Sequence, residues 1–118
     1  MRILLVDNRA LSHGLVVDMF PGHHVEWANT GTDGVDRALL NPYDVVLVDH
    51  SLPDGEGADY VAEMRALGVR VPMVGMVSAG KESAAEAFLE AGADDVCHTD
   101  QFATGEVEAL LLTLVVAP

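Results

Sequence analysis

Polar residues stand directly after four apolar segments of this chain, and two of these residues are aspartates. If the segments are neighbouring strands, the carboxylates of Asp7 and Asp49 are brought together and repel each other unless a cation lies between them. Oxygen ligands of this kind suit Mg²⁺, and such a cation also neutralises phosphoryl oxygens during transfer to a carboxylate nucleophile. The pair therefore indicates phosphoryl chemistry, although aspartate also caps helices and begins turns. The four polar groups are Asp7-Asn8, Asp49-His50-Ser51, Ser78-Ala79-Gly80 and His98-Thr99.

Five apolar or alternating segments are expected to be the strands that position these residues. The first, third and fourth are nearly continuous aliphatic runs, which are typical of parallel strands buried on both faces by helices. The second alternates and the fifth is short, so these two are predicted to be edge strands. Because a stretch typical of a helix follows each strand, we expect an α/β fold: a doubly wound, three-layer, flavodoxin-like structure around a five-stranded parallel sheet of order 2-1-3-4-5. The segments are Arg2 to Val6, His24 to Ala28, Tyr43 to Val48, Val71 to Val77 and Asp95 to His98.

Apolar spacing also predicts which helix faces cover the sheet. One stripe of apolar residues runs along the last helix and a narrower one along the helix before it. Gly68 and Gly92 follow two helical stretches and are predicted C-caps. Leu112 and Val116 carry apolar character onto a second face, which is either the start of a linker or a surface for homodimer formation. The stripes are Val107, Leu110, Leu111, Leu114 and Val115, and Ala84, Phe88 and Ala91.

Length and charge limit the possible functions. The 118 residues, half of them apolar, suffice for one core, so we expect a single domain over residues 1–118. The formal net charge of −13 repels nucleic acids and anionic membranes, so this domain is expected to bind neither; it would also suit a high-salt habitat. A lone cysteine, Cys97, and the lack of a leader or a membrane-spanning apolar run favour a cytoplasmic location.

From Met1 to about Val116 the chain resembles a response-regulator receiver domain of two-component signalling. The matching pieces are MRILLVDN, YDVVLVDHSLPDGEG, VPMVGMVSAG and GADDV, in family order and at family spacing. The second is the most specific, because a strand that ends in Asp and leads through Leu-Pro-Asp-Gly into a helix is rarely assembled by chance. The run Pro53-Asp54-Gly55 is itself typical of a tight turn.

The resemblance implies that a histidine kinase, a phosphotransfer protein or a small phosphodonor phosphorylates Asp49. It implies a Mg²⁺ site made by Asp7, the adjacent Asn8, Asp49 and the backbone carbonyl of Ser51. Ser78 matches the hydroxyl that binds the phosphoryl group in the activated state. Such a domain is a switch and not an enzyme, beyond its own phosphorylation and dephosphorylation.

Three departures from the family pattern affect this expectation. Asn8 stands where a second acid is usual, so metal affinity should fall, although a one-residue gap would change that alignment. Thr99 stands at the position of the usual lysine, which removes a charge-assisted hydrogen bond worth roughly 1.5 to 3 kcal/mol. Lys81 is a weak candidate to replace it. Val96 replaces the usual aromatic residue, so a signal from Ser78 must leave by another route.

Other kinds of site are less well supported by the sequence. His50 and His98 fall at the same edge of the sheet, but no pair of histidines has the spacing of a zinc site. Cys97 is best explained as a small buried residue. Ser78 lacks the Gly-x-Ser-x-Gly context of a hydrolase. The loop after the first strand lacks the glycines and hydroxyls of a flavin phosphate site.

Two functions therefore compete, with a third behind them. The first is a phosphoacceptor switch in which Asp49 is modified with Mg²⁺ and Ser78 responds. The second is a pseudo-receiver that binds partners regardless of phosphorylation, having lost the lysine at position 99 and one acid. The third is a small flavodoxin-like enzyme.

Overall fold

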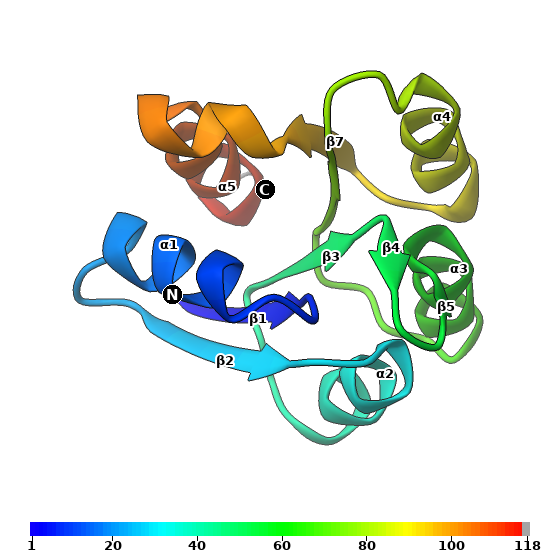
Figure 1. Cartoon of the computed structure of the whole chain (residues 1–118). Helices are drawn as coiled ribbons and strands as arrows, with labels where there is room; N and C mark the ends of the chain where they lie inside the picture. Colours follow the sequence, from blue (N-terminus) through cyan, green and yellow to red (C-terminus); the bar gives the residue numbers. More distant parts are fainter. Residues whose placement is uncertain (117–118) are drawn as a thin grey trace.

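Five parallel strands form the central sheet in the order β2-β1-β3-β6-β7, with helices on both sides (Figure 1). The computed structural model describes residues 1–116, except for the side chains at positions 10–13, 19, 102–103 and 116. The order confirms the doubly wound fold and places the two predicted edge strands at the edges. The strands are β1 (Arg2–Val6), β2 (His24–Ala28), β3 (Val45–Asp49), β6 (Met73–Val77) and β7 (Asp95–His98).

The bounds of two strands differ from the sequence-based expectation. β3 and β6 each begin two residues later than predicted. Pro72 has no N–H to donate and joins the sheet only through its carbonyl, which accepts a hydrogen bond from Val46. β3 also extends to Asp49, which lies opposite Met76 of β6. The phosphoacceptor candidate is therefore the last residue of a strand and is held by the sheet.

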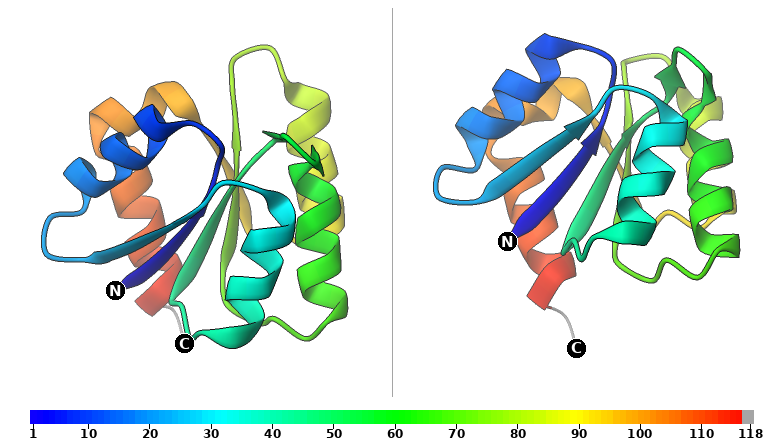
Figure 2. Two further views of the ribbon diagram at one scale, coloured as in Figure 1. Left: turned by 60° about the horizontal axis from the view of Figure 1, so that its bottom comes forward. Right: turned by 90° about the horizontal axis from the view of Figure 1, so that it is seen from below.

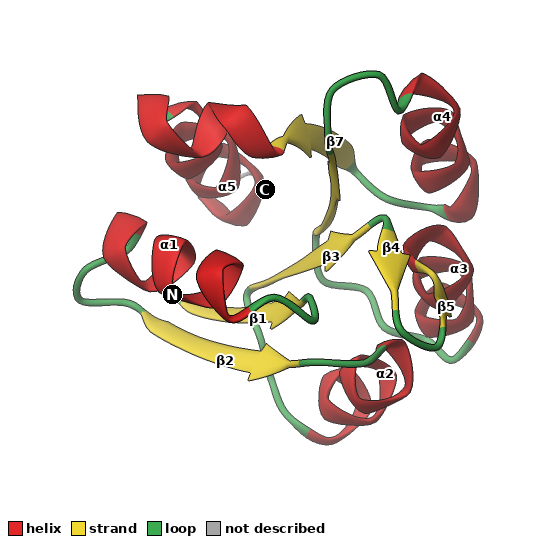
Figure 3. Ribbon diagram, viewed as in Figure 1, coloured by secondary structure: helices red, strands yellow, loops and turns green. Residues whose placement is uncertain are grey.

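Helices cover both faces of the sheet, as Figures 2 and 3 show. The face with α1 and α5 packs Val16, Phe20, Val107 and Leu111 on the sheet. The opposite face packs α2, α3 and α4 through Val35, Val61, Met64 and Phe88. The helices are α1 (Ala10–Met19), α2 (Gly31–Leu40), α3 (Gly57–Ala66), α4 (Glu82–Ala91) and α5 (Glu106–Val116), with a 3₁₀ helix η1 (Thr99–Thr104) and a short hairpin of β4 (Ser51–Leu52) and β5 (Gly55–Glu56).

The predicted helix faces and one of the two predicted caps are confirmed. Val107, Leu111 and Phe88 are buried, and the other members of the two stripes pack against the same cores. Gly92 is the left-handed C-cap of α4. Gly68, also left-handed, follows the C-cap of α3 instead of forming it. Leu112 is 40% exposed, whereas the Val116 side chain, its predicted companion on the second face, lies outside the described residues.

The aromatic ring of Phe88 lies over two glycines. A Cβ atom built on Gly75 of β6 would lie 2.7 Å from Cε2 of this ring and closer still to Cγ and Cδ2. A Cβ atom on Gly57, the first residue of α3, would lie 2.9 Å from its Cζ. The fully buried ring therefore fills the space that a side chain at Gly75 would occupy, whereas at Gly57 the carbonyl oxygen of Asp49 is closer still. In the part of the chain that the structure describes, no helix is long and apolar enough to cross a membrane.

Candidate functional site

Asp7 and Asp49 lie next to each other at the carboxyl end of the sheet, as predicted. Val6 of β1 is the register partner of Val48 of β3, and the two aspartates are the next residues along each strand. Asp7 is fully buried and Asp49 is 3% exposed, and they are the charged residues buried among those described. Two carboxylates in one buried place need compensation, because both burial and like charge disfavour ionisation.

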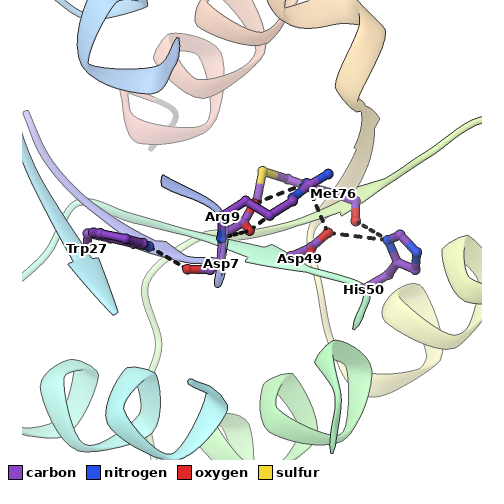
Figure 4. Close-up of polar contacts among 6 residues, drawn as sticks. All are labelled: Asp7, Arg9, Trp27, Asp49, His50 and Met76. Carbon is purple, nitrogen blue, oxygen red and sulfur yellow. Dashed lines mark hydrogen bonds and ion pairs between the residues drawn. The ribbon is translucent and has the colours of Figure 1, made fainter. Parts of the chain in front are cut away.

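Arg9 supplies part of that compensation (Figure 4). Its Nε and Nη2 atoms each lie 3.2 Å from an oxygen of Asp7, and its backbone N–H donates to Asp7 Oδ1 at 2.9 Å. The same Nη2 lies 3.7 Å from Oδ1 of Asp49. The hydrogen bond to Asp7 is the main reason that the pKa of Arg9 is raised. This role of Arg9 was not predicted from the sequence, in which its only signal is a cation two positions after the first aspartate.

His50 lies on the other side of Asp49. Its Nδ1 is 3.3 Å from Asp49 Oδ1 and 3.2 Å from the carbonyl oxygen of Met76. Its side chain is 19% exposed, so it lies partly open to solvent beside the phosphoacceptor candidate. Arg9 and His50 therefore flank Asp49 from two sides.

Asp49 keeps one oxygen without a hydrogen bond. Its Oδ1 is buried and accepts none from the described residues, although Arg9 and His50 approach it. Burial and the charge of Asp7 raise the pKa of Asp49, while Arg9 and His50 act in the opposite direction. A buried acceptor that lacks a donor is destabilising unless something else binds it.

The remaining predicted site residues lie around this pair and are more exposed than the two aspartates. Asn8 and Ser51 are exposed, and Ser51 begins the β4–β5 hairpin. Ser78 and Thr99 follow the ends of β6 and β7, whose residues Val77 and His98 are register partners. Both are partly exposed. All the polar groups predicted from the strand ends thus share one edge of the sheet.

Lys81 stands at the N-cap position of α4 and is exposed. Its exposed position is that of a solvated residue.

Asp54 has a role that its turn motif does not reveal. One carboxylate oxygen accepts from the backbone N–H of Gly31 at 2.8 Å, and the other from the N–H and hydroxyl of Thr32 at 3.0 and 2.9 Å. Tyr60 donates its hydroxyl to the Asp54 carbonyl oxygen. Burial opposes ionisation, but these donors outweigh it and lower the pKa of Asp54. The turn after Asp49 is therefore fixed to the first turn of α2.

The donor set fits Mg²⁺ in its chemistry. Two carboxylates, an amide oxygen and a backbone carbonyl are all hard oxygen ligands, and Asp49 Oδ1 is a buried acceptor without a hydrogen bond in the described structure. Among the described residues, no three His, Cys, Asp or Glu side chains gather in a way that could hold a metal ion. Any cation here must therefore rely on Asn8, the Ser51 carbonyl and water in addition to the two aspartates.

Comparison with known families decides the class of this protein. The model of the response regulator receiver domain matches residues 3–101. The chain belongs to this family. It is thus a receiver domain of two-component signalling, and its five-stranded fold agrees with this assignment. The family also disfavours the flavodoxin-like enzyme among the three functions considered.

Individual relatives support the same assignment. The chain is 34% identical over 100 residues to the two-component response regulator ORR41 of Oryza sativa, covering 79% of that protein. It is 33% identical to the transcriptional regulatory protein QseB of Escherichia coli O157:H7 but covers 53% of it. It covers only 10% of the sensor histidine kinases RcsC that it also matches. The chain therefore corresponds to one part of several larger relatives.

A solved structure resembles the receiver closely. The receiver domain of the sensor histidine kinase PA1611 from Pseudomonas aeruginosa PAO1 is 26% identical, covers 98% of both chains and has a TM-score of 0.87. That domain was solved with a magnesium ion coordinated in its active site cleft. The Francisella response regulator 1452 receiver domain, at 19% identity and a TM-score of 0.85, shows the same fold.

Proposed function

We propose that this receiver is a phosphoacceptor switch in which Asp49 takes a phosphoryl group from a histidine kinase or a phosphotransfer protein. The observation that carries the proposal is Asp49 Oδ1, a buried oxygen at a strand end with no hydrogen bond among the described residues. An oxygen that accepts no hydrogen bond keeps its lone pairs available for nucleophilic attack. We also propose that residues 1–118 act as one cytoplasmic domain and that the last helix contributes to any homodimer.

The proposed reaction forms a bond between an Asp49 oxygen and phosphorus and breaks the bond between phosphorus and the donor nitrogen. The electron pair of that broken bond stays on the donor imidazole. Arg9 and His50, each within 3.7 Å of Asp49 Oδ1, favour the ionised carboxylate that the reaction needs. Asp7, Asn8, Asp49 and the Ser51 carbonyl would hold Mg²⁺, which when bound neutralises charge on the phosphoryl oxygens.

Two hydroxyl groups would meet the modified side chain. Ser78 and Thr99 follow the ends of the two strands beyond β3, so both stand at the edge where the phosphoryl group would lie. Ser78 is the proposed donor of a hydrogen bond to that group. Thr99 supplies a hydroxyl where a lysine would supply a cation, so the phosphorylated state should be less stabilised than in a receiver that has the lysine.

The test is the intact mass of the purified domain after incubation with acetyl phosphate and Mg²⁺. We expect an added phosphoryl mass on the wild type and none on Asp49→Asn. Thr99→Lys should accumulate more adduct, by about tenfold or more if a charge-assisted hydrogen bond is restored. An acyl-phosphate mimic that binds Asp49 excludes rapid hydrolysis as the reason for a missing adduct. Absence of both adduct and mimic binding would favour the phosphorylation-independent pseudo-receiver.

A further inference from the structure

The guanidinium of Arg9 occupies the place between the two buried carboxylates where a cation would bind. It forms a fork with Asp7 through Nε and Nη2, both at 3.2 Å, and Nη2 also faces Asp49 Oδ1 at 3.7 Å (Figure 4). Such a fork is the geometry in which arginine binds a carboxylate most specifically. A single side chain therefore links both acids of the site.

Both oxygens of Asp7 are engaged in this arrangement. Oδ1 accepts from the backbone N–H and from Nε of Arg9, and Oδ2 accepts from Nη2. An inner-sphere divalent cation needs lone pairs of the same carboxylate. The guanidinium and the metal ion therefore compete for the same oxygens.

Charge leads to the same conclusion. Two buried carboxylates carry two negative charges, and Asn8 adds an uncharged amide at the position next to Asp7. One guanidinium reduces the local charge to about that of a single carboxylate without any metal. The Arg9 side chain is 49% exposed, so it can leave the site toward solvent while the two aspartates remain buried.

We propose that Arg9 is a tethered counter-cation of the Asp7–Asp49 pair and that a divalent cation binds this pair only by displacing it. The affinity of the site for Mg²⁺ is then set by the Arg9 side chain as well as by the ligands. This inference shares the cation site with the proposed function, but its tests require no phosphoryl transfer. Failure of phosphorylation and failure of this inference can therefore be told apart.

The first test is a Mg²⁺ titration of the metal-free domain followed by calorimetry and by tryptophan fluorescence. Trp27 is a suitable reporter because its indole N–H donates to the carbonyl oxygen of Asp7 (Figure 4). Arg9→Gln should bind Mg²⁺ about fivefold to tenfold more tightly than the wild type. In this variant no guanidinium has to be displaced from the carboxylate oxygens before the metal ion binds them. Arg9→Lys should lie between them, because an ammonium cannot form the fork.

Arg70→Gln is the matched control. Arg70 is exposed and precedes β6, at the end of the sheet opposite to the site. The Arg70→Gln substitution removes the same unit charge from the same acidic domain, so it reports the general electrostatic effect on cation affinity. Unchanged or weaker Mg²⁺ binding by Arg9→Gln relative to Arg70→Gln would overturn the competition.

The second test applies even if no variant binds Mg²⁺. Thermal unfolding in EDTA is compared for wild type, Arg9→Gln, Asp49→Asn and the double variant. Arg9→Gln should lower the melting temperature because both carboxylates lose their cation, and this loss should shrink in the Asp49→Asn background. Equal losses in both backgrounds would refute the counter-cation role. If Arg9→Gln does not fold, Arg9→Lys replaces it; this variant keeps the charge but not the fork, so its smaller loss should still shrink in the Asp49→Asn background.

Discussion

Replacing Gly75 by alanine should destabilise this receiver because the new methyl group meets a fixed aromatic ring. The added Cβ would lie 2.7 Å from Cε2 of Phe88 and closer to two other ring atoms, and Phe88 is fully buried. Overpacking of this kind costs about 1–3 kcal/mol. The lower chain entropy of alanine in the unfolded state returns roughly 0.5–1 kcal/mol. We expect a net loss of about 1–2 kcal/mol from the two opposing effects.

The assay is urea unfolding followed by circular dichroism, with the slope on denaturant checked to be unchanged. Gly14→Ala is the matched control: Gly14 lies within α1, and a Cβ there has nothing within 4 Å. This substitution should stabilise the domain by about 0.5–1 kcal/mol, so the same chemical change is expected to have opposite signs at the two positions.

The Phe88→Ala background tests the stated cause. That change alone should cost about 3–5 kcal/mol through the cavity it creates, so the measurement is made near 15 °C, where domains are typically about most stable. Without the ring, Gly75→Ala should be neutral or stabilising because its methyl group enters the cavity. If Gly75→Ala were as harmful in this background as in the wild type, or harmless in the wild type, the packing argument would be wrong.

Three further predictions concern other parts of the molecule. Arg65 donates to the carbonyl oxygens of Gly92, Val69 and Val71 and to the Asp94 carboxylate. Arg65→Ala should therefore lower the free energy of unfolding by about 2–3 kcal/mol in urea titrations. A loss below about 0.5 kcal/mol would contradict this expectation. Asp54→Ala should cost about 1 kcal/mol at pH 7, as the loss of a helix cap does. Because folding lowers the pKa of Asp54, the stabilisation by its carboxylate is present above the ordinary aspartate value of 3.8 and is lost as the pH falls below it. Thermal unfolding from pH 7 to pH 2 should therefore show the variant converging on the wild type. Burial raises the pKa of the Cys97 thiol to about 12, so labelling with a thiol reagent at pH 8 should be slow in the native domain and rapid in urea, and fast native labelling would refute the burial.

Most of the fold could be predicted from the sequence because hydrophobic patterning controls it. The continuous run before Asp49 and the alternating segment that ends at Ala28 indicated a central and an edge strand, and both are confirmed. The starts of β3 and β6 were predicted too early. Tyr43 and Val71 are apolar enough for a strand, but the lack of an N–H on Pro72 is a property of the backbone that hydrophobicity does not report.

The site could be predicted only in part. The strand ends brought Asp7 and Asp49 together as expected, because parallel strands share one carboxyl edge. Arg9 and Asp54 were not foreseen in their roles. The position of a long side chain such as that of Arg9 depends on rotamers, and the acceptor function of Asp54 depends on a helix 23 residues earlier in the chain. The functional assignments of Ser78 and Thr99 remain predictions.

The contact between Asp54 and the first turn of α2 has a consequence for how the protein folds as it is synthesised. Gly31 and Thr32 leave the ribosome before the residue whose carboxylate binds their N–H groups. Until Asp54 follows, these donors lack that acceptor, and a ten-residue helix is marginal without tertiary support. The nascent helix should therefore become stable only once β3 and the turn after Asp49 have been made. The amino-terminal β1–α1–β2–α2 segment would then not fold stably until the strand that ends in Asp49 has been synthesised. A nascent chain halted before residue 54 should therefore be digested readily within α2 by a protease.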